Sequence, residues 1–214
     1  MPEPNIFRNL HALVNTLKNK KSVLCAWFNA DTYSDIEEIV IASVSANTFR
    51  AFSHMPLRPS DIFHSWAINL LSQKSFIRNI KAINSQTVFD KWQFNFASSF
   101  EKYWNYKMGK RHSIPFGASR KLPNLLLKHI VLWNALSKND RNKLIGFLHI
   151  PYDSYSLLTL KNAVAGIKIP STATMQYVDN LALYNLLTIQ SKLIATFANV
   201  PPIYIDVLAW NEAH

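Results

Sequence analysis

The stretch that most constrains the fold is IPFGASRKLPNLLL, residues 114–127. Gly117 and the small residues beside it predict a tight turn, and the apolar run over 122–127 predicts a helix after it. A turn of this kind directs backbone N–H groups and the positive end of a helix towards an anion, and phosphate is the obvious candidate. An ordinary turn between two helices on a solvated basic face would have a similar sequence, so these residues alone leave both interpretations open.

Cationic residues gather around this turn. The chain has no acidic residue between Glu101 and Asp140, and seven cationic side chains lie between 102 and 128: Lys102, Lys107, Lys110, Arg111, Arg120, Lys121 and Lys128. The whole chain of 214 residues has 23 Lys and Arg against 13 Asp and Glu, a formal net charge of +10. This charge indicates a polyanionic partner, although it says nothing about the fold.

The rest of the sequence predicts helices in a single domain that spans 1–214. Only four glycines occur, which is too few for the many turns of an all-β protein. Apolar residues recur at three- and four-residue steps, as at Ile62, Trp66 and Leu70. The β-branched stretch 38–45 is also predicted to be a helix, whereas 203–207, after two prolines, is predicted to be a short strand or an extended tail. The expected fold class is all-α.

The sequence lacks the marks of several classes of site and protein. A single cysteine, Cys25, cannot form an intrachain disulfide or supply the ligands of a structural zinc site or an iron–sulfur cluster. The histidines have no metal-binding spacing, so we expect no metal and no cofactor. The first residues lack the layout of a secretory signal, and no apolar run is long enough to cross a bilayer. We therefore expect an intracellular, cytoplasmic protein that has no membrane partner and is associated with the nucleoid when bound to DNA.

GASRKLPNLLL, residues 117–127, resembles the hairpin and second helix of the helix-hairpin-helix DNA glycosylase superfamily. On this match Gly117 and Ser119 take the places of the two hairpin glycines, and Lys121 takes the place of the catalytic lysine of the bifunctional members. Two residues depart from the family pattern. Ser119 replaces a glycine, and Pro123 stands where alanine is common, which is tolerable only in the first turn of a helix.

A second motif follows in the order that the family has. IPYDSY, residues 150–155, is similar to the segment that carries the family's catalytic aspartate, which falls on Asp153. The interval from Lys121 to Asp153 is 32 residues, and this spacing resembles that of the archaeal 8-oxoguanine glycosylase branch. The resemblance covers about 113–160, and two motifs in the right order are stronger than one.

The resemblance implies a compact two-lobed helical bundle, with the helix-hairpin-helix motif at about 106–130 and the aspartate segment at about 149–160. It also implies a monomer that binds double-stranded DNA with one nucleotide flipped out of the duplex. The residues expected to contact DNA lie in or beside the hairpin: Phe116, Gly117, Ala118, Ser119, Arg120, Lys110 and Arg111.

Lys121 and Asp153 suit the cleavage of an N-glycosidic bond. The departing base leaves oxocarbenium character on the sugar, which a carboxylate such as Asp153 stabilises, and the same carboxylate could activate an attacking water. An amine that attacks C1′ displaces the base and leaves a Schiff base, from which strand cleavage can follow. Without catalysis, Lys121 would contact a phosphate beside Arg120, and Asp153 would cap a helix over 154–162; the cap is compatible with catalysis.

The flipped base needs a pocket with flat or apolar walls. Aromatic residues crowd the segment just before the basic stretch, and we assign Trp92 and Trp104 as candidates for a pocket or wedge, although most of these aromatic side chains are expected in the core. The archaeal resemblance suggests a purine like 8-oxoguanine as the substrate. A modified cytosine of the phage type is equally open, and in that case the role would be antiviral defence rather than DNA repair.

Two other classes of function remain open at this stage. The chain could be a non-enzymatic DNA-binding module that uses the hairpin and the basic face without chemistry. It could also be an interaction or inhibitor protein whose basic face meets an acidic partner.

Overall fold

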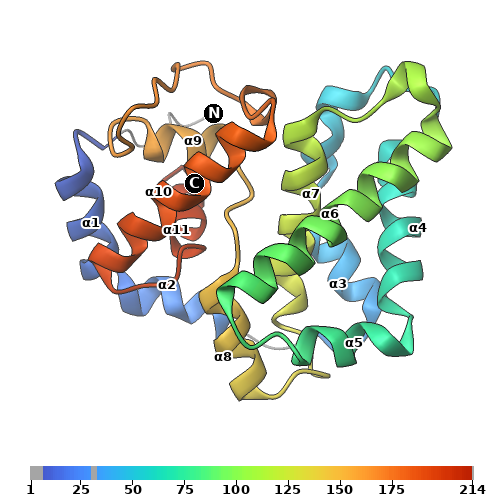
Figure 1. Cartoon of the computed structure of the whole chain (residues 1–214), viewed down its shortest axis with the longest axis horizontal. Coiled ribbons are helices and arrows are strands. Elements are labelled where there is room, and N and C mark those ends of the chain that lie inside the picture. Colours follow the sequence, from blue (N-terminus) through green and yellow to red (C-terminus); the bar gives the residue numbers. More distant parts are fainter. Residues whose placement is uncertain (1–6, 30–32, 214) are drawn as a thin grey trace.

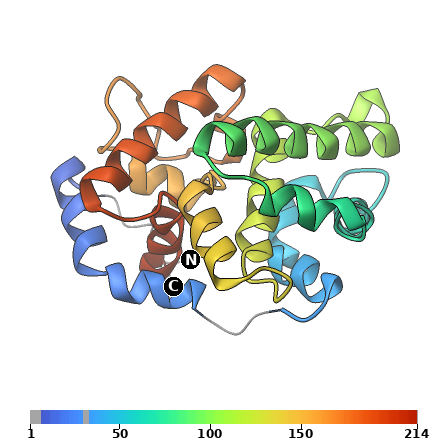
Figure 2. The same cartoon turned by 60° about the horizontal axis from the view of Figure 1, so that its bottom comes forward.

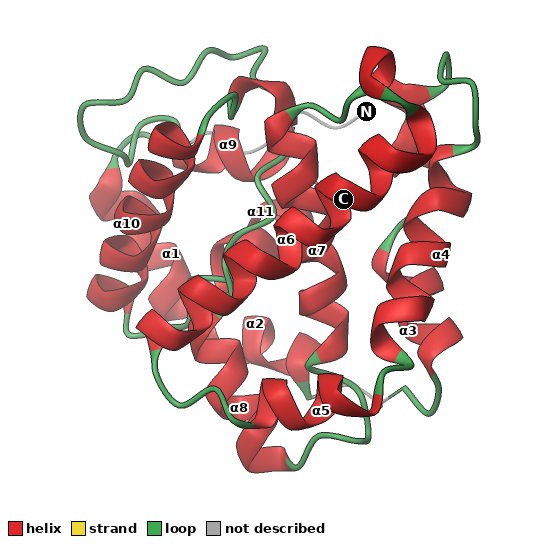
Figure 3. Cartoon of the chain, turned by 45° about the vertical axis from the view of Figure 1, so that its right-hand side comes forward, coloured by secondary structure: helices red, strands yellow, loops and turns green. Residues whose placement is uncertain are grey.

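The computed structural model describes residues 7–29 and 33–213, and in this part it contains helices and no strand (Figure 3). The prediction of an all-α fold is confirmed. The α-helices are α1 (Leu10–Asn19), α2 (Lys21–Phe28), α3 (Ile36–Ser43), α4 (Pro59–Leu71), α5 (Lys74–Lys81), α6 (Gln86–Met108), α7 (Phe116–Ile130), α8 (Lys138–Phe147), α9 (Ser154–Leu160), α10 (Leu181–Ala198) and α11 (Tyr204–Ala213). Three short 3-10 helices are η1 (Ala46–Phe52), η2 (Lys110–His112) and η3 (Met175–Tyr177).

The helices from the two ends of the chain pack together. Helix α11 contacts α9, α2, α1 and α10, and α10 also contacts α1, so these five helices lie on one side of the molecule (Figure 1). We call these five helices the terminal helices. On the other side α7 contacts α3 and α6, and α4 contacts α3, α5 and α6. A view from a second direction keeps the same division (Figure 2). Side chains of α7 that face the terminal helices therefore lie where the two groups of helices meet.

Side-chain caps begin several of these helices. Ser137 accepts a hydrogen bond from Asp140 N at the start of α8, and Asn180 accepts one from Leu183 N at the start of α10. Asp35 caps α3 in the same way, which confirms the prediction of a helix in this β-branched segment. Each cap satisfies an N–H that has no partner within its own helix.

The segment 203–207 corrects a prediction. It is not a strand or an extended tail: Ile203 lies in a turn after Pro201 and Pro202, and the rest of the segment is the beginning of α11 at Tyr204. Ile205 and Val207 are fully buried, and α11 packs on α9 and α2. The preference of β-branched residues for strands is weak, and burial on several sides outweighs it here.

The turn expected at Gly117 also lies elsewhere. Helix α7 already begins at Phe116, directly after Pro115, and the chain turns instead in the link 109–115, where Gly109 has a φ of 77°. The expectation that Pro123 lies in a first turn is wrong as well, because it lies in the interior of α7.

Gly117 is required by close packing rather than by a turn. A Cβ at Gly117 would lie 1.8 Å from the carbonyl oxygen of Met175 and 2.8 Å from that of Val178. Because backbone atoms cannot move aside cheaply, we expect Gly117→Ala to lower the free energy of unfolding by about 1–3 kcal/mol or more. Gly146 in α8 has no atom within 4 Å of an added Cβ. Gly146→Ala is therefore expected to raise the same free energy by roughly 0.5–1 kcal/mol.

Urea unfolding followed by circular dichroism measures both variants. Equal changes in the two variants would contradict the close contact between α7 and the segment around η3.

The sequence analysis expected no apolar run long enough to cross a bilayer, and α10 differs from this expectation. By length and composition it is the one helix among the described residues that could cross a membrane. In this structure Tyr184, Leu187 and Ile194 bury one side of α10 in the molecule, while Ile189 and Phe197 on other sides are more than half exposed. The helix thus takes part in the core of the folded chain.

Candidate active site

Helix α7 carries two lysines that face the terminal helices. Lys121 and Lys128 are seven residues apart, which is about two helical turns, so their side chains leave the same face of α7. Each forms an ion pair with an aspartate of the other group of helices: Lys121 with Asp153 at the start of α9, and Lys128 with Asp206 in α11. The two pairs form the candidate site.

The structure brings together the two residues that the motifs singled out. Lys121 Nζ lies 3.7 Å from Asp153 Oδ2, and their side chains are 13% and 7% exposed. Asp153 Oδ1 accepts hydrogen bonds from the backbone N–H groups of Tyr155 and Ser156, both at 3.0 Å, and so caps α9. This confirms the predicted cap. Because the cap holds Oδ1, the carboxylate is fixed in orientation with Oδ2 directed at the amine.

The second pair is more deeply buried. Lys128 Nζ donates to Asp206 Oδ2 at 2.7 Å, and the Asp206 side chain is 0% exposed. Lys128 Nζ also lies over the ring of Trp27, 4.4 Å from its centroid. Asp206 Oδ1 is buried and has no hydrogen-bond partner among the described residues. A buried carboxylate oxygen that makes no hydrogen bond is costly and needs an explanation.

Electrostatics join the two pairs into one cluster. Burial raises the pKa of Asp206 above its usual range, and the Asp153 carboxylate acts in the same direction. The ammonium groups of Lys128 and Lys121 oppose this shift. A change of charge at Lys121 or Asp153 is therefore felt at Asp206.

Sequence reasoning missed Asp206 and Trp27 and counted Lys128 only as one of seven cations. The seven-residue spacing from Lys121 could have placed Lys128 on the same face of a helix as Lys121. No comparable signal existed for Asp206, because its segment was predicted to be extended.

The residues predicted to contact DNA divide into two sets. Lys110 and Arg111 are exposed in the link between α6 and α7, where an anion can reach them. Gly117, Ala118 and Ser119 are fully or almost fully buried in α7, so the predicted phosphate-binding turn at these residues is wrong. The N-terminal end of α7, to which these residues belong, is covered by the close contact with the segment around η3.

Arg120 and Phe116 are the remaining two residues that were predicted to contact DNA. Arg120 is directed to α6, its guanidinium contacts the rings of Phe94 and Phe116, and its side chain is buried, so it is not on an open DNA-binding surface. Phe116 itself is half-buried.

The two tryptophans assigned to a pocket or wedge lie in the packing around α6. Trp104 is 0% exposed, and its indole N–H donates to the carbonyl of His112, so it is a core residue. Trp92 is half-buried and stacks on Phe96, with further ring contacts to Phe76 and Phe89. The assignment of Trp104 to a pocket is wrong, and the contacts of Trp92 are those of a side chain that fills the space between helices.

His129, next to Lys128 on α7, is expected to make the free energy of unfolding depend on pH. Its Nδ1 lies 2.9 Å from Tyr33 Oη, and burial, with a smaller effect of the Lys128 charge, lowers the pKa of His129 to about 3. The folded chain therefore keeps this imidazole neutral at pH values where the unfolded chain protonates it. We expect the free energy of unfolding to fall as the pH drops from about 6.5 towards 3, with a contribution from this residue of about 1.4 kcal/mol per pH unit.

Urea unfolding at a series of pH values checks this contribution. His129→Gln, which keeps a polar group near Tyr33, should show a shallower decrease than the natural chain between pH 6 and pH 4. Parallel curves for the two proteins would contradict the assignment. His149, whose pKa is also lowered by burial, is present in both proteins and cancels in the comparison.

Comparisons with protein families, with curated proteins and with solved structures found no match for this chain. Among the residues in 7–29 and 33–213, no group of three or more His, Cys, Asp or Glu side chains could hold a metal ion.

Proposed function

We propose that this chain is a DNA glycosylase of the helix-hairpin-helix type, in which Lys121 and Asp153 act on the same deoxyribose. One observation carries the proposal: the amine and the carboxylate that two separate motifs singled out, 32 residues apart, lie 3.7 Å from each other. The proposal treats the two groups of helices as two lobes, with α6, the link 109–115 and α7 as the helix-hairpin-helix motif.

The chemistry uses one group to stabilise charge and the other to form a bond. As the glycosidic bond breaks, the base leaves with the electron pair and takes up a proton, and Asp153 Oδ2 stabilises the positive charge on the sugar. The ammonium of Lys121 in its ion pair with Asp153 supplies this proton, and the neutral amine that remains attacks C1′ and forms a carbon–nitrogen bond. Ring opening then gives a Schiff base, from which elimination of the 3′ phosphate cleaves the strand. The cap that fixes Asp153 preorganises the carboxylate for this task.

Lys128, Asp206 and Trp27 would line the place of the base, one to two turns of α7 beyond Lys121. The unpartnered Asp206 Oδ1 favours a base that presents an additional donor. 8-Oxoguanine offers an N7–H that guanine lacks, and a hydroxymethylated cytosine offers a hydroxyl. In this structure the side chains of the two lysine–aspartate pairs are nearly closed off from solvent, so the proposal requires α9 and α11 to move away from α7 when a nucleotide enters.

The DNA backbone would meet the exposed cations at the link between α6 and α7. Lys102 and Lys107 on the last turns of α6 and Lys110 and Arg111 in the link are all exposed. Contacts between these cations and phosphates release counterions, so binding should weaken steeply with salt.

A panel of duplexes tests the proposal. Each duplex carries one modified base, among them 8-oxoguanine, 5-hydroxymethylcytosine and its glucosylated form, and free base is measured by mass spectrometry. We expect release from at least one duplex by the natural chain and none from the unmodified duplex. Salt-dependent binding to every duplex without release from any would contradict the enzyme and support the second candidate, a DNA-binding module without chemistry. The closed state of the Lys121–Asp153 pair is the observation that favours this second candidate.

A further inference from the structure

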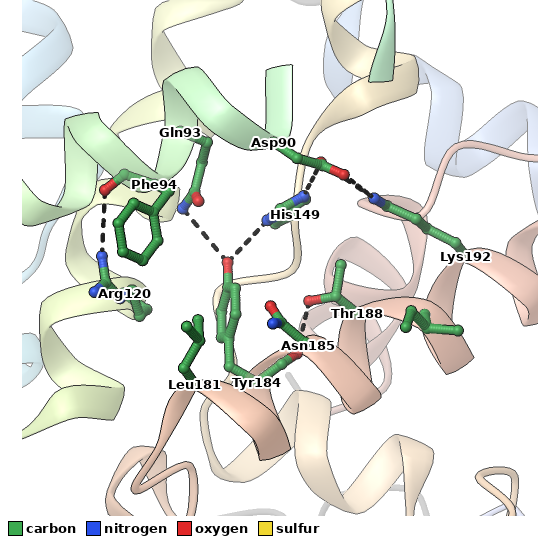
Figure 4. Close-up of a pocket in the computed structure, with 11 residues that line it drawn as sticks. Asp90, Gln93, Phe94, Arg120, His149, Leu181, Tyr184, Asn185, Thr188 and Lys192 are labelled. Carbon is green, nitrogen blue, oxygen red and sulfur yellow. Dashed lines mark hydrogen bonds and ion pairs between the residues drawn. The ribbon is translucent and has the colours of Figure 1, made fainter. Parts of the chain in front are cut away.

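A cavity separate from the lysine–aspartate pairs lies between α6, α7 and α10. Its volume is about 380 Å³, and residues of all three helices line it, together with His149 from the segment between α8 and α9 (Figure 4). Neither Lys121 nor Asp153 belongs to its walls. Any ligand of this cavity would thus be bound away from the proposed site of base excision.

One end of the cavity holds a buried cation that is poorly satisfied. The Arg120 side chain is 6% exposed, and its Nε is buried without a hydrogen-bond partner. The Nη atoms make long hydrogen bonds, at 3.4 Å to Ser98 Oγ and at 3.5 Å to Phe94 O, and a long ion pair, also at 3.5 Å, with Glu101 Oε2. Burial lowers the pKa of Arg120, yet a guanidinium stays protonated at neutral pH. A permanent charge in these surroundings favours an anion as its partner.

Two aromatic rings contact the guanidinium. Its central carbon lies 4.9 Å from the centroid of the Phe94 ring and 4.8 Å from that of Phe116. Contacts of this kind restrict where the guanidinium can lie, and its N–H groups remain donors that an anion can accept from.

The other end of the cavity is already neutralised. Lys192 Nζ lies 3.1 Å from Asp90 Oδ2, and Asp90 Oδ1 lies 2.7 Å from His149 Nε2. His149 Nδ1 in turn lies 2.9 Å from Tyr184 Oη (Figure 4). Tyr184 Oη also accepts a hydrogen bond from Asn124. Lys192 lies closer to its carboxylate partner than the 3.5 Å that separates Arg120 from Glu101, and of the two cations only Arg120 has a buried nitrogen without a hydrogen-bond partner, so we expect an added anion to bind at Arg120 rather than at Lys192.

The wall between the two ends is largely apolar. Helix α10 contributes Leu181 and Ile189, which are 41% and 55% exposed, and α6 contributes Phe94, which is 42% exposed. Asn185 adds an exposed amide on the same helix. A wall of this kind suits an apolar body that carries a single anionic group.

We propose that the cavity between α6, α7 and α10 binds a small organic anion whose carboxylate or phosphate group is held by Arg120 and whose apolar body lies along Phe94, Leu181 and Ile189. The two head groups share the chemistry that a guanidinium recognises. This proposal does not depend on glycosylase activity, because none of these residues belongs to the Lys121–Asp153 pair.

Isothermal titration calorimetry with four probes tests the proposal: phenyl phosphate, phenylacetate, inorganic phosphate and neutral benzyl alcohol. We expect phenyl phosphate, phenylacetate or both to bind the natural chain, and the probe that binds identifies the head group. Inorganic phosphate and benzyl alcohol should each bind at least about tenfold more weakly, because each lacks one half of the recognised chemistry.

Three variants locate the binding. Ile189→Trp fills the cavity from an exposed position and should weaken binding at least about tenfold, whereas Leu193→Trp, at an exposed position of the same helix outside the cavity, should leave it unchanged. Arg120→Lys keeps the positive charge but loses the planar set of N–H donors of the guanidinium, and it should weaken binding about tenfold. Absence of binding by both aryl anions, equal binding of benzyl alcohol, or binding that Ile189→Trp does not change would overturn the proposal.

Discussion

Lys121→Gln is expected to give no covalent complex with DNA when borohydride is added during the reaction, whereas the natural chain is trapped on its substrate. Borohydride reduces a Schiff base, and a Schiff base requires a primary amine, which glutamine lacks. Strand cleavage should disappear with trapping for the same reason. Gel electrophoresis of a labelled duplex, chosen as the one from which free base is released, measures both. Lys138→Gln, at an exposed position of α8, is the matched control and should be trapped normally.

Asp153→Asn tests the other half of the pair. Asparagine is as good a helix cap as aspartate, so α9 should keep its start while the negative charge is lost. Base release should fall by about 10²–10³-fold, the usual cost of removing one group that stabilises a developing charge. Asp140→Asn, at the start of α8, removes a carboxylate from a comparable place outside the site and should not affect release. Normal release by Asp153→Asn, or trapping of Lys121→Gln, would remove the assigned roles.

Local signals explain why one part of the site could be predicted from the sequence. Lys121 and Asp153 each stand within a short motif, and the order of the two motifs indicated that the side chains meet, although the turn expected at Gly117 is wrong. The structure adds the physical reason for their meeting: Lys121 faces the terminal helices from α7, and Asp153 caps α9, which belongs to those helices.

The other half of the site depends on contacts between distant segments. Asp206 lies 78 residues beyond Lys128, and its segment, which contains several β-branched residues, was predicted to be a short strand or an extended tail. Only its packing against α9 and α2 makes it helical and turns the aspartate inward. The position of Trp104 could not be predicted for a similar reason. Aromatic side chains suit a base pocket and a core equally, and in this chain Trp104 is needed to fill the core beside Phe52 and Phe100.

Gly117 shows how one residue can support two interpretations. A glycine followed by small residues and a helix is typical of a phosphate-binding turn, and it is equally typical of a helix that a backbone segment approaches closely. The distances to Met175 and Val178 decide for the second in this chain. The turn itself is made by Gly109, which the sequence-based prediction did not use.

Lys128→Met is expected to destabilise the chain by about 3–5 kcal/mol, because it leaves the Asp206 carboxylate buried without its cation. The double variant Lys128→Met/Asp206→Leu removes both charges and should return to within about 1–2 kcal/mol of the natural chain. Urea unfolding at pH 7 measures these free energies and gives the coupling between the two side chains. Lys143→Met is the control. It breaks the ion pair with Asp140 near the surface and should cost less than about 1 kcal/mol.

The dependence on pH separates loss of the ion pair from loss of packing. In Lys128→Met the pKa of Asp206 no longer has its main opposing charge, so burial should raise it further. A carboxyl whose pKa is higher in the folded than in the unfolded chain contributes stability at low pH and loses it as the pH rises. Lys128→Met should therefore recover part of its deficit, relative to the natural chain, when the pH is lowered from 7 towards 4.5. A deficit that stays constant over this range would mean that the lysine stem, packed on Trp27, and not its charge, holds α7 against α11.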